Sequence, residues 1–378
     1  MPLADHQRNK LNKHKEPNKP NLIIRSEILS KAERMTQLVK EFLLNAGAMD
    51  VGIATTETLA GGPPSTDLSY IMPDAKSAVC FAVPLDQKGI ERFLSKQDCR
   101  THNIDNRRTN SLASGMAFEL ATFLTMRGRR SKAVCANSHY RSEVPRGLYS
   151  ELPDLSHRYL AVRSGLGYFG FSGNVIRSDV GGAIILGSVV TTTELVPSDA
   201  LPPEDNYCDN CKRCLRACVS GLMSDTEETT VTMGGVSFTY AKRRAYSRCE
   251  YVCGGFAGLH PSGQWSTWSP ARFNIPDKDA EFTPALLAAV EPYRNRPRLD
   301  YGFYHPLVPG SKIEFTCGHC QLVCHPDKEI RRKRYQMITQ NGVVIQYPDG
   351  NLEAVPPDKA VDHLNKMDAE MRALYEKV

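Results

Sequence analysis

The N-terminal half of the chain alternates between two hydrophobic patterns. Apolar residues recur at helical spacing over 22–47, from Ile28 to Leu43, and predict a helix that stops at Gly47. The same spacing over 110–127 predicts a second helix. Short apolar runs bounded by Gly or Pro predict strands at 50–54, 75–84, 133–136 and 181–190. Helices that alternate with strands in this way indicate an α/β (α+β) fold rather than a β-sandwich.

The pattern changes at the proline-containing segment 197–203, where we place a domain boundary. A cysteine-rich region follows, and a Pro- and charge-rich insertion with few evident elements interrupts it at about 261–309. Beyond it, 342–347 and 350–355 predict a hairpin, and 358–377 predicts a final helix. The predicted organisation is a flexible basic arm at 1–21, an α/β domain at 22–200, a cysteine-rich domain at 201–335, and a C-terminal hairpin and helix at 336–378.

The composition is that of a globular protein, with 41% hydrophobic and 24% charged residues among 378. It excludes a chain that is disordered over most of its length, a collagen-like repeat and a coiled-coil rod. No apolar run reaches the roughly 18–20 residues of a membrane span. The first 25 residues are basic and lack the apolar core of a secretory signal, so we expect a cytoplasmic protein. A net charge of +5 does not by itself indicate a nucleic-acid-binding protein.

The distribution of the twelve cysteines is the most informative feature of the sequence. All of them except Cys80, Cys99 and Cys135 fall between Cys208 and Cys324. Disulfides are rare in the cytoplasm, so clustered cysteines there indicate metal or redox chemistry. Cys80 and Cys135 lie in predicted buried strands, and we expect the scattered cysteines to be inert core thiols.

Two cysteine motifs have the spacing of iron–sulfur ligands. Cys208, Cys211, Cys214 and Cys218 form C-x2-C-x2-C-x3-C, and Cys317, Cys320 and Cys324 form C-x2-C-x3-C. The first spacing is that of bacterial two-cluster ferredoxins, in which three thiolates bind one cluster and the fourth binds the other. Four-thiolate zinc sites usually have two C-x2-C pairs that are separated by about a dozen residues or more. The spacing therefore predicts two 4Fe-4S clusters rather than zinc.

Two such clusters need eight thiolates, and the two motifs supply seven. By analogy with ferredoxins, one cluster is held by Cys208, Cys211, Cys214 and Cys324. The other is held by Cys218, Cys317, Cys320 and an eighth ligand, which is either Cys249 or Cys253. Val219 and His325 stand where a proline usually follows the last cysteine, which weakens a helix start without removing a ligand. Two neighbouring clusters imply an electron acceptor in the other domain.

Several segments occur in the order found in a known group of enzymes. They are DVGIA, MPDAKSAVCFAVPL, RYLAVRSGLGYFGFSGNVI and GGAIILGSVVTTTEL, followed by the two cysteine motifs. Together they resemble the superfamily of cobalamin-dependent epoxyqueuosine reductases and reductive dehalogenases, over about residues 35–335. The resemblance implies a corrinoid-binding α/β domain that holds cobalamin without an axial histidine, followed by a ferredoxin-like domain with two 4Fe-4S clusters. It also implies that reduced ferredoxin or flavodoxin supplies electrons, which pass through the clusters to the corrin cobalt.

The glycine-rich segment 165–173 is the main candidate for contact with the cofactor. Its glycines permit close backbone approach and positive φ angles, which suit a large planar ligand. By resemblance, the cobalamin-binding residues are Arg158, Gly165, Gly167, Ser172, Gly173 and Asn174. The letters G-L-G-Y-F-G also match a dinucleotide loop, but such a loop should follow a strand, and a helix-like segment precedes it here. We therefore reject a Rossmann interpretation, and a glycine-rich turn without a ligand remains the alternative.

The resemblance also suggests where a catalytic acid lies. Epoxyqueuosine reductases carry an aspartate upstream of the G-L-G, and Glu151 falls at that position, with Asp154 as the neighbour if the register shifts. Desolvation above a corrin would raise the pKa of either carboxyl and allow it to donate a proton. Dehalogenases instead use a tyrosine beside a basic residue. The candidates for that pair here are Tyr140, Tyr149, Arg141 and Arg146.

The substrate is less determined than the redox machinery. The basic run RRKR at 331–334 could contact phosphates, but an exposed helix face explains it equally well. The helical repeats with which epoxyqueuosine reductases grip tRNA are not evident, so tRNA is only weakly supported as a partner. Trp265 and Trp268 could cover a cluster, although packing of a large loop is the more ordinary explanation. The alternatives are a small organic substrate such as an organohalide, or a non-catalytic iron–sulfur electron carrier.

Overall fold

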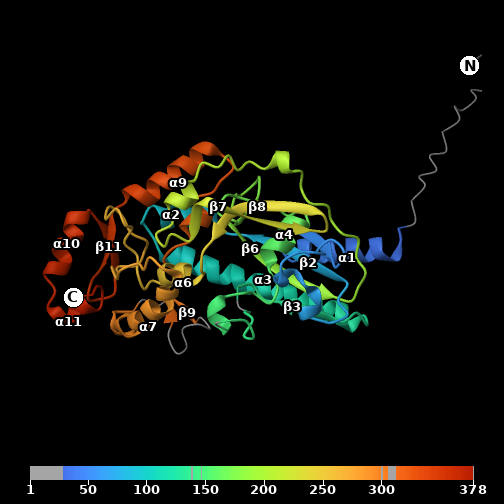
Figure 1. Cartoon of the computed structure of the whole chain (residues 1–378), viewed down its shortest axis with the longest axis horizontal. Helices are drawn as coiled ribbons and strands as arrows, with labels where there is room; N and C mark the ends of the chain where they lie inside the picture. Colours follow the sequence, from blue (N-terminus) through green and yellow to red (C-terminus); the bar gives the residue numbers. More distant parts are fainter. Residues whose placement is uncertain (1–28, 138, 146, 299–300, 305–311, 378) are drawn as a thin grey trace, which may run out of the picture.

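The structure is a computed structural model of the chain, and it describes residues 29–137, 139–145, 147–298, 301–304 and 312–377. The predicted arm at 1–21 and the first part of the predicted N-terminal helix lie outside these residues. None of the helices in the described ranges is long and apolar enough to cross a membrane. Helix α1 (Lys31–Asn45) lies toward one end of the long axis, and β11 (Val343–Gln346) lies toward the other (Figure 1).

A four-stranded antiparallel sheet forms the centre of the N-terminal half. Its strand order is β1 (Asp50–Thr55), β2 (Ser77–Pro84), β6 (Ile184–Thr191) and β3 (Ser131–Val134). The apolar runs in the sequence predict all four strands. In β2, Val79 and Phe81 are buried on one face of the sheet, and Ala78 and Cys80 are buried on the other. Because both faces are covered, the strand is apolar throughout rather than alternating with polar residues.

Helices α1 and α3 (Arg100–Met126) cover one face of the sheet, and α4 (His157–Arg163) covers the other. Helix α3 begins well before the predicted start at residue 110. Its first turns are polar yet buried: the Asn103 amide donates to Phe315 O at 3.0 Å, and the Asp105 carboxylate accepts the backbone N–H of Asp86 at 2.8 Å. Partners far away in the sequence stabilise these turns, so the hydrophobic pattern does not reveal them.

The second half of the chain begins with a long hairpin that the hydrophobic pattern does not indicate. Strands β7 (Met223–Met233) and β8 (Val236–Arg243) pair antiparallel. Val231, Met233 and Tyr240 pack into the core on the α4 side of the sheet. Most other residues of β7 are exposed and polar, which hides the strand from a reading based on apolar residues.

The remaining elements are shorter or follow the hairpin. They are α2 (Gln87–Leu94), β4 (Tyr168–Phe169), β5 (Val175–Ile176), α5 (Arg213–Arg216), α6 (Ser247–Cys253), α7 (Asp279–Asn295), β9 (Phe303–Tyr304), β10 (Lys312–Ile313), α8 (His319–Leu322), α9 (Lys328–Gln340), β12 (Leu352–Val355), α10 (Pro357–Asn365) and α11 (Ala369–Ala373), with short 3-10 helices at Pro64–Thr66, Leu68–Tyr70, Gly147–Ser150 and Pro203–Asp205.

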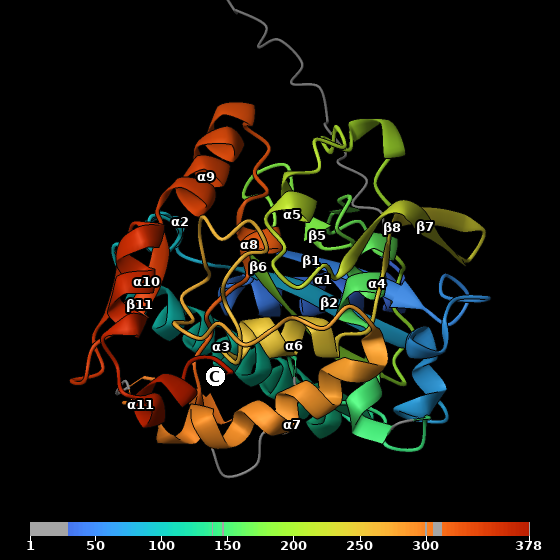
Figure 2. The same cartoon turned by 60° about the vertical axis from the view of Figure 1, so that its left-hand side comes forward.

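The insertion at 261–309 contains more structure than the sequence predicts. It includes α7, which packs against α6 through a buried aromatic cluster (Figure 2). Asp279, at the start of α7, forms an ion pair with Arg248 of α6. Pro284 and Pro292 lie inside α7, and prolines ordinarily argue against a helix interior. The insertion therefore supports the helix that carries two of the candidate cluster cysteines.

The C-terminal segment confirms the predicted hairpin, because β11 pairs antiparallel with β12. The prediction of one helix over 358–377 is wrong, since the segment forms two helices, α10 and α11. The chain turns between them. The side chain of Asp368 then accepts the backbone N–H of Met371 at 2.8 Å and caps the second helix.

The loop before β6 docks the sheet onto the second cysteine motif. The backbone N–H of Gly182 donates to Cys324 O at 3.3 Å. The preceding Gly181 has a φ of +67°, and a Cβ there would lie 2.2 Å from the same carbonyl oxygen. Glycine is required here both by the left-handed backbone and by the close approach of the neighbouring chain.

Replacing Gly181 by alanine should therefore destabilise the protein more than the backbone conformation alone explains. Gly128→Ala is the matched control, because Gly128 has a φ of +73° but no atom within 4 Å of the added Cβ. The control should lower the free energy of unfolding by about 1–2 kcal/mol. Gly181→Ala should lower it by about 1–3 kcal/mol more through steric overlap. Urea unfolding measures both, and equal losses would contradict the docking of Cys324 against this glycine.

Candidate functional site

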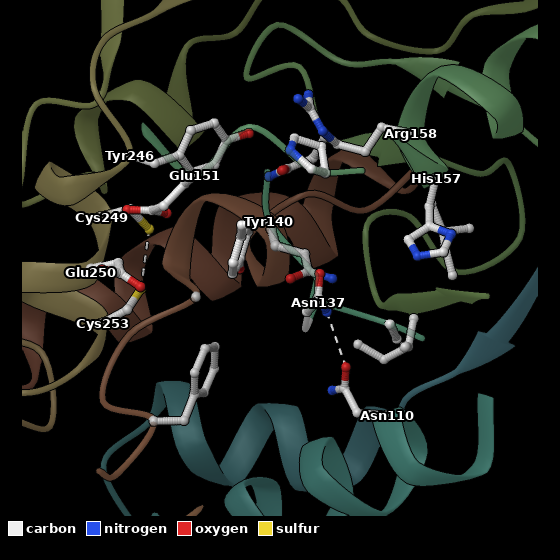
Figure 3. Close-up of a pocket in the computed structure, with 18 of the residues that line it drawn as sticks. Asn110, Asn137, Tyr140, Glu151, His157, Arg158, Tyr246, Cys249, Glu250 and Cys253 are labelled. Atoms are coloured by element: carbon white, nitrogen blue, oxygen red, sulfur yellow. Dashed lines mark hydrogen bonds between the residues drawn. The ribbon is translucent and has the colours of Figure 1, made fainter. Parts of the chain in front are cut away.

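A cavity of about 1160 Å³ lies between the sheet and the cysteine-rich half of the chain. Helix α3 lines one side with Asn106 and Asn110, and α4, α6 and the segment after β3 line the others (Figure 3). Asn137, which has a φ of +51°, donates its side-chain amide to Asn110 Oδ1 at 3.0 Å. The volume exceeds the roughly 300–1000 Å³ of ordinary small-molecule pockets, so the cavity has room for a bulky ligand.

One group of thiols brings the two cysteine motifs together. Cys208, Cys211 and Cys324 lie close to Cys214. Burial, followed by the charges of these three neighbours, raises the pKa of Cys214 to about 12. The hydroxyl of Tyr207 lies 3.4 Å from Cys324 Sγ. The four thiols are the set predicted for one cluster, and the donor set is the one that 4Fe-4S clusters use.

The second group of thiols lines the cavity itself. It consists of Cys218, Cys249, Cys253, Cys317 and Cys320. Burial, followed by the charges of Cys218, Cys249 and Cys317, raises the pKa of Cys320 well above its usual value. Among the described residues, no three His, Cys, Asp or Glu side chains are arranged to hold a single metal ion. In a 4Fe-4S cluster, by contrast, each thiolate binds a different iron.

Cys249 and Cys253 occupy different positions in this second group. They lie one turn apart on α6, with their Sγ atoms 3.4 Å apart. Cys253 contacts Cys317, whereas the charge of Cys249 acts on both Cys218 and Cys320. A cluster ligand has to face the other three ligands. Because the charge of Cys249 acts on two of the other three ligands, we take Cys249 as the candidate for the eighth ligand, to be tested against Cys253.

Two arginines of the basic run at 331–334 connect the cysteine motifs. Arg331 and Arg334 are each only 2% exposed. Arg331 Nη2 donates to Asp209 of the first motif at 3.1 Å, and Arg334 Nη1 donates to Leu322 O of the second motif at 3.0 Å. The expectation of an exposed or phosphate-binding run is therefore wrong for these two residues. The other two residues of the run are exposed.

Glu151 is a predicted acid that does lie in the cavity wall. It is 6% exposed and has a φ of +51°. Its side chain forms a hydrogen bond with Glu250 of α6, so two carboxyl groups share this wall of the cavity. Burial raises the pKa of Glu250 to about 7, although this hydrogen bond acts in the opposite direction. Figure 3 shows both carboxyls beside Cys249 and Cys253.

The other candidate acids are placed differently. Asp154 is half-buried and is not among the described residues that line the cavity. Tyr140 does line it, and burial raises the pKa of its hydroxyl. Arg141 turns away from the cavity and donates to Pro64 O and Asp154 O. The side chain of Tyr149 and all of Arg146 lie outside the described part of the structure.

Two of the six predicted cobalamin-binding residues, Arg158 and Asn174, line the cavity. The other four are not among the described residues that line it: Gly165, Gly167, Ser172 and Gly173. A Cβ on any of these three glycines would lie 2.4 to 2.6 Å from the protein's own atoms. The glycines therefore serve close packing within the chain, which differs from the cofactor contact expected from the sequence.

Beside the second thiol group lies a set of polar residues that sequence reasoning missed in part. Arg243 and Tyr246 line the cavity together with Arg158. Arg243 donates to the Tyr246 hydroxyl and, at 2.7 Å, to Asn174 Oδ1, and Asn174 Nδ2 lies 3.6 Å from Cys320 Sγ. Burial opposes ionisation of Tyr246, but the two guanidinium groups lower the pKa of its hydroxyl. These residues lie on three separate segments, so no sequence spacing connects them.

His157 lines the cavity, but both of its ring nitrogens are engaged. Nδ1 lies 2.8 Å from Ser188 Oγ, and Nε2 lies 3.2 Å from Cys135 O. Because a carbonyl only accepts, Nε2 donates and Nδ1 accepts. Burial lowers the pKa of His157 to about 4. His157 is therefore a neutral structural residue. Cys135 lies at the cavity and is half-buried, which corrects its prediction as a core thiol.

These features define a mixed α/β protein with two groups of cysteine thiols, one of which shares a large cavity with a buried acid. No protein-family model matches the chain. The chain is similar to a curated epoxyqueuosine reductase of Synechocystis sp., at 37% identity over 82 residues, which are 19% of this chain and 27% of that relative. Further curated relatives carry the same name, and in each case the match spans half of the relative's length or less. The predicted resemblance to this superfamily is thereby confirmed.

Two solved structures are also similar to this chain. A reductive dehalogenase aligns with a TM-score of 0.45 and 16% identity, over 60% of this chain and 30% of its own. An epoxyqueuosine reductase crystallised with a tRNA stem loop aligns with a TM-score of 0.42 and 16% identity, over 79% of this chain and 68% of its own.

The position of Cys249 leads to a prediction about the iron content. In protein reconstituted with iron and sulfide, Cys249→Ser should remove about half of the bound iron, because one of two clusters loses a ligand. Cys253→Ser is the matched control on the same helix and should retain nearly all of it. Iron and sulfide analysis measures both variants. Full iron in the Cys249 variant, together with a loss in the Cys253 variant, would reverse the assignment.

Proposed function

We propose that this chain is a cobalamin-dependent iron–sulfur reductase that acts on epoxyqueuosine in tRNA. The observation that carries the proposal is the position of the second thiol group. Cys218, Cys249, Cys317 and Cys320 line the same cavity as the buried acid Glu151. A cluster bound there would border the contents of the cavity without an intervening layer of protein. The curated relatives named epoxyqueuosine reductase support the choice of substrate.

The residues divide into groups that would hold the cofactors. Cys208, Cys211, Cys214 and Cys324 would hold the outer 4Fe-4S cluster, and the second thiol group would hold the inner one. Arg158 and Asn174 would contact cobalamin in the cavity. When bound, the clusters would supply electrons and cobalamin would supply a low-valent cobalt centre for the reduction. Reduced ferredoxin or flavodoxin in the cytoplasm would be the electron donor.

Glu151 would donate one of the two protons that are consumed, together with two electrons, when the epoxide oxygen leaves as water. Opening an epoxide leaves an oxygen that has to be protonated, and a buried carboxylic acid can donate to it. Burial raises the pKa of the neighbouring Glu250 to about 7, so this wall of the cavity can hold a proton near neutral pH. The surrounding protein largely excludes water from Glu151, so the donor is retained where the substrate would bind.

Reconstitution tests the proposal directly. The chain is loaded with iron, sulfide and hydroxocobalamin, and its absorption spectrum reports whether the corrinoid binds. A tRNA stem loop that contains epoxyqueuosine is then incubated with the loaded protein and a low-potential reductant. Formation of queuosine supports the proposal. Iron binding without corrinoid binding would overturn it and would leave a non-catalytic electron carrier as the function.

Substitution of Glu151 tests the role of the acid. Glu151→Gln should lower queuosine formation at least about a hundredfold, because an amide cannot donate a proton as a carboxylic acid does. Reduction of the bound corrinoid, followed by its absorption spectrum, should be unchanged. Asp154→Asn is the control and should retain activity, since Asp154 is not among the described cavity residues. An active Glu151 variant would exclude this residue as the proton donor.

The second candidate function is reduction of a small organic molecule such as an organohalide. One observation favours it: Tyr246 faces the cavity beside two half-buried arginines, Arg158 and Arg243. A tyrosine paired with a basic residue is the arrangement that the resemblance associates with dehalogenases. Arg243 and Tyr246 provide this pair in place of the combination of Tyr140 with Arg141, because Arg141 turns away.

Tyr246→Phe separates the two candidate functions. If a small molecule is the substrate, this variant should lose at least about a hundredfold in turnover of an aryl halide, because the hydroxyl donates the proton. If the epoxide in tRNA is the substrate, Tyr246→Phe should retain most of the queuosine formation, and Glu151→Gln should not. Turnover of both substrates by both variants measures the difference. Loss of activity toward tRNA in the tyrosine variant alone would contradict the assignment of Glu151.

A further inference from the structure

Lys96 buries its charge in an unusual way. It follows helix α2 and has a φ of +59°, a left-handed conformation that glycine adopts more readily than lysine. Its stem is half-buried, yet its Nζ atom is fully buried and has no hydrogen-bond acceptor in the part of the chain that the structure describes. Lysines normally do the reverse, burying the stem and keeping the ammonium group in water.

The ammonium group of Lys96 lies beside Trp268, which is hydrogen-bonded to the residue before Cys317. Nζ lies 5.5 Å from the centre of the Trp268 ring. The indole N–H of Trp268 donates to Phe93 O at 2.9 Å, and its backbone N–H donates to Thr316 O at 2.9 Å. Trp268 thus joins the end of α2 to the residue that precedes Cys317. These two hydrogen bonds fix the end of α2, which Lys96 follows, relative to the segment before Cys317.

Asn103 of α3 reinforces the same segment. Its amide donates to Phe315 O at 3.0 Å, and its side-chain oxygen accepts the N–H of Phe315 at 2.9 Å. Two elements of the N-terminal half therefore hold the chain just before Cys317. The expectation that Trp268 packs in a large loop is met, and the packing also places a cation beside this cysteine.

A buried ammonium group without a partner is costly unless a negative charge lies nearby. Burial lowers the pKa of Lys96 to about 8, while the charges of Cys317 and Cys99 act in the opposite direction, so the group is mostly protonated near pH 7. Burial raises the pKa of the Cys99 thiol to about 12, so Cys99 is neutral near pH 7. Cys99 Sγ is also already engaged by the Asn103 amide at 3.1 Å. Cys317, as a thiolate bound to a cluster, is therefore the remaining source of negative charge.

We propose that Lys96 raises the reduction potential of the inner 4Fe-4S cluster, the one held by Cys218, Cys249, Cys317 and Cys320. This inference rests on the cluster that the proposed function places there. Reduction adds one electron to the cluster, and a fixed positive charge beside one of its thiolates stabilises the more negative, reduced state. Net charge near the cluster and burial are among the factors that set such potentials.

The test is a redox titration of the full chain reconstituted with iron and sulfide, with dithionite as reductant and detection by electron paramagnetic resonance. In Lys96→Met, the inner cluster's reduced-to-oxidised ratio at a fixed potential should fall at least tenfold, a shift of about 59 mV for one electron. Only one of the two reduction waves should move. Lys96→Arg keeps the charge and the same backbone strain, so its potential should stay close to that of the unmodified protein.

Two further variants make the test decisive. Lys88→Met removes an exposed charge from helix α2 and should leave both waves in place. Lys96→Gly relieves the left-handed strain and should shift the inner wave as Lys96→Met does, which keeps the test valid if the methionine variant folds poorly. An unchanged potential in Lys96→Met or Lys96→Gly with full iron content would overturn this inference alone. Unmodified protein that assembles no inner cluster would overturn the proposed function and this inference with it.

Discussion

The arrangement of the site depends on contacts that hold two cysteine motifs, far apart in the sequence, against one central sheet. Cys324 O rests on Gly181 and Gly182 at the start of β6, at a distance that excludes a side chain on Gly181. Buried arginines of α9 add to this contact, since Arg331 binds the first motif and Arg334 binds the second. These contacts therefore hold thiols from both motifs close to one another, as the ligands of a multi-iron cluster have to be.

The sheet and the cysteine-rich half share the cavity between them. Helices α3 and α4 supply an amide- and histidine-lined side, while α6 and α8 supply thiols. The insertion holds α6 in place through α7, so a segment that lacks an obvious pattern contributes directly to the site. Arg158 and Arg243 line the same cavity as the second thiol group, and so do the carboxyls of Glu151 and Glu250.

Elements with a local apolar pattern could be predicted from the sequence, whereas elements that depend on contacts with distant segments could not. Strands β1, β2 and β6 were predictable because both of their faces are buried, which leaves a continuous apolar run. The β7–β8 hairpin was not, since most of β7 is exposed, and α7 was hidden by Pro284 and Pro292. The start of α3 was missed for a related reason. Its polar residues are stabilised by backbone groups from distant segments. The spacing of apolar residues along the sequence does not reveal such contacts.

The resemblance to known enzymes suggested Glu151 as an acid. By itself, the spacing in the sequence determined the chemistry of the donors, two cysteine motifs that suit 4Fe-4S clusters. Spacing over a few residues is enough for this, because a short loop restricts where its own side chains can point. Only the tertiary structure distinguished Glu151 from Asp154, made Cys249 the candidate for the eighth ligand, and placed Lys96 and Tyr246 at the site. Those choices depend on burial and on neighbours from other segments, which exist only once the chain has folded.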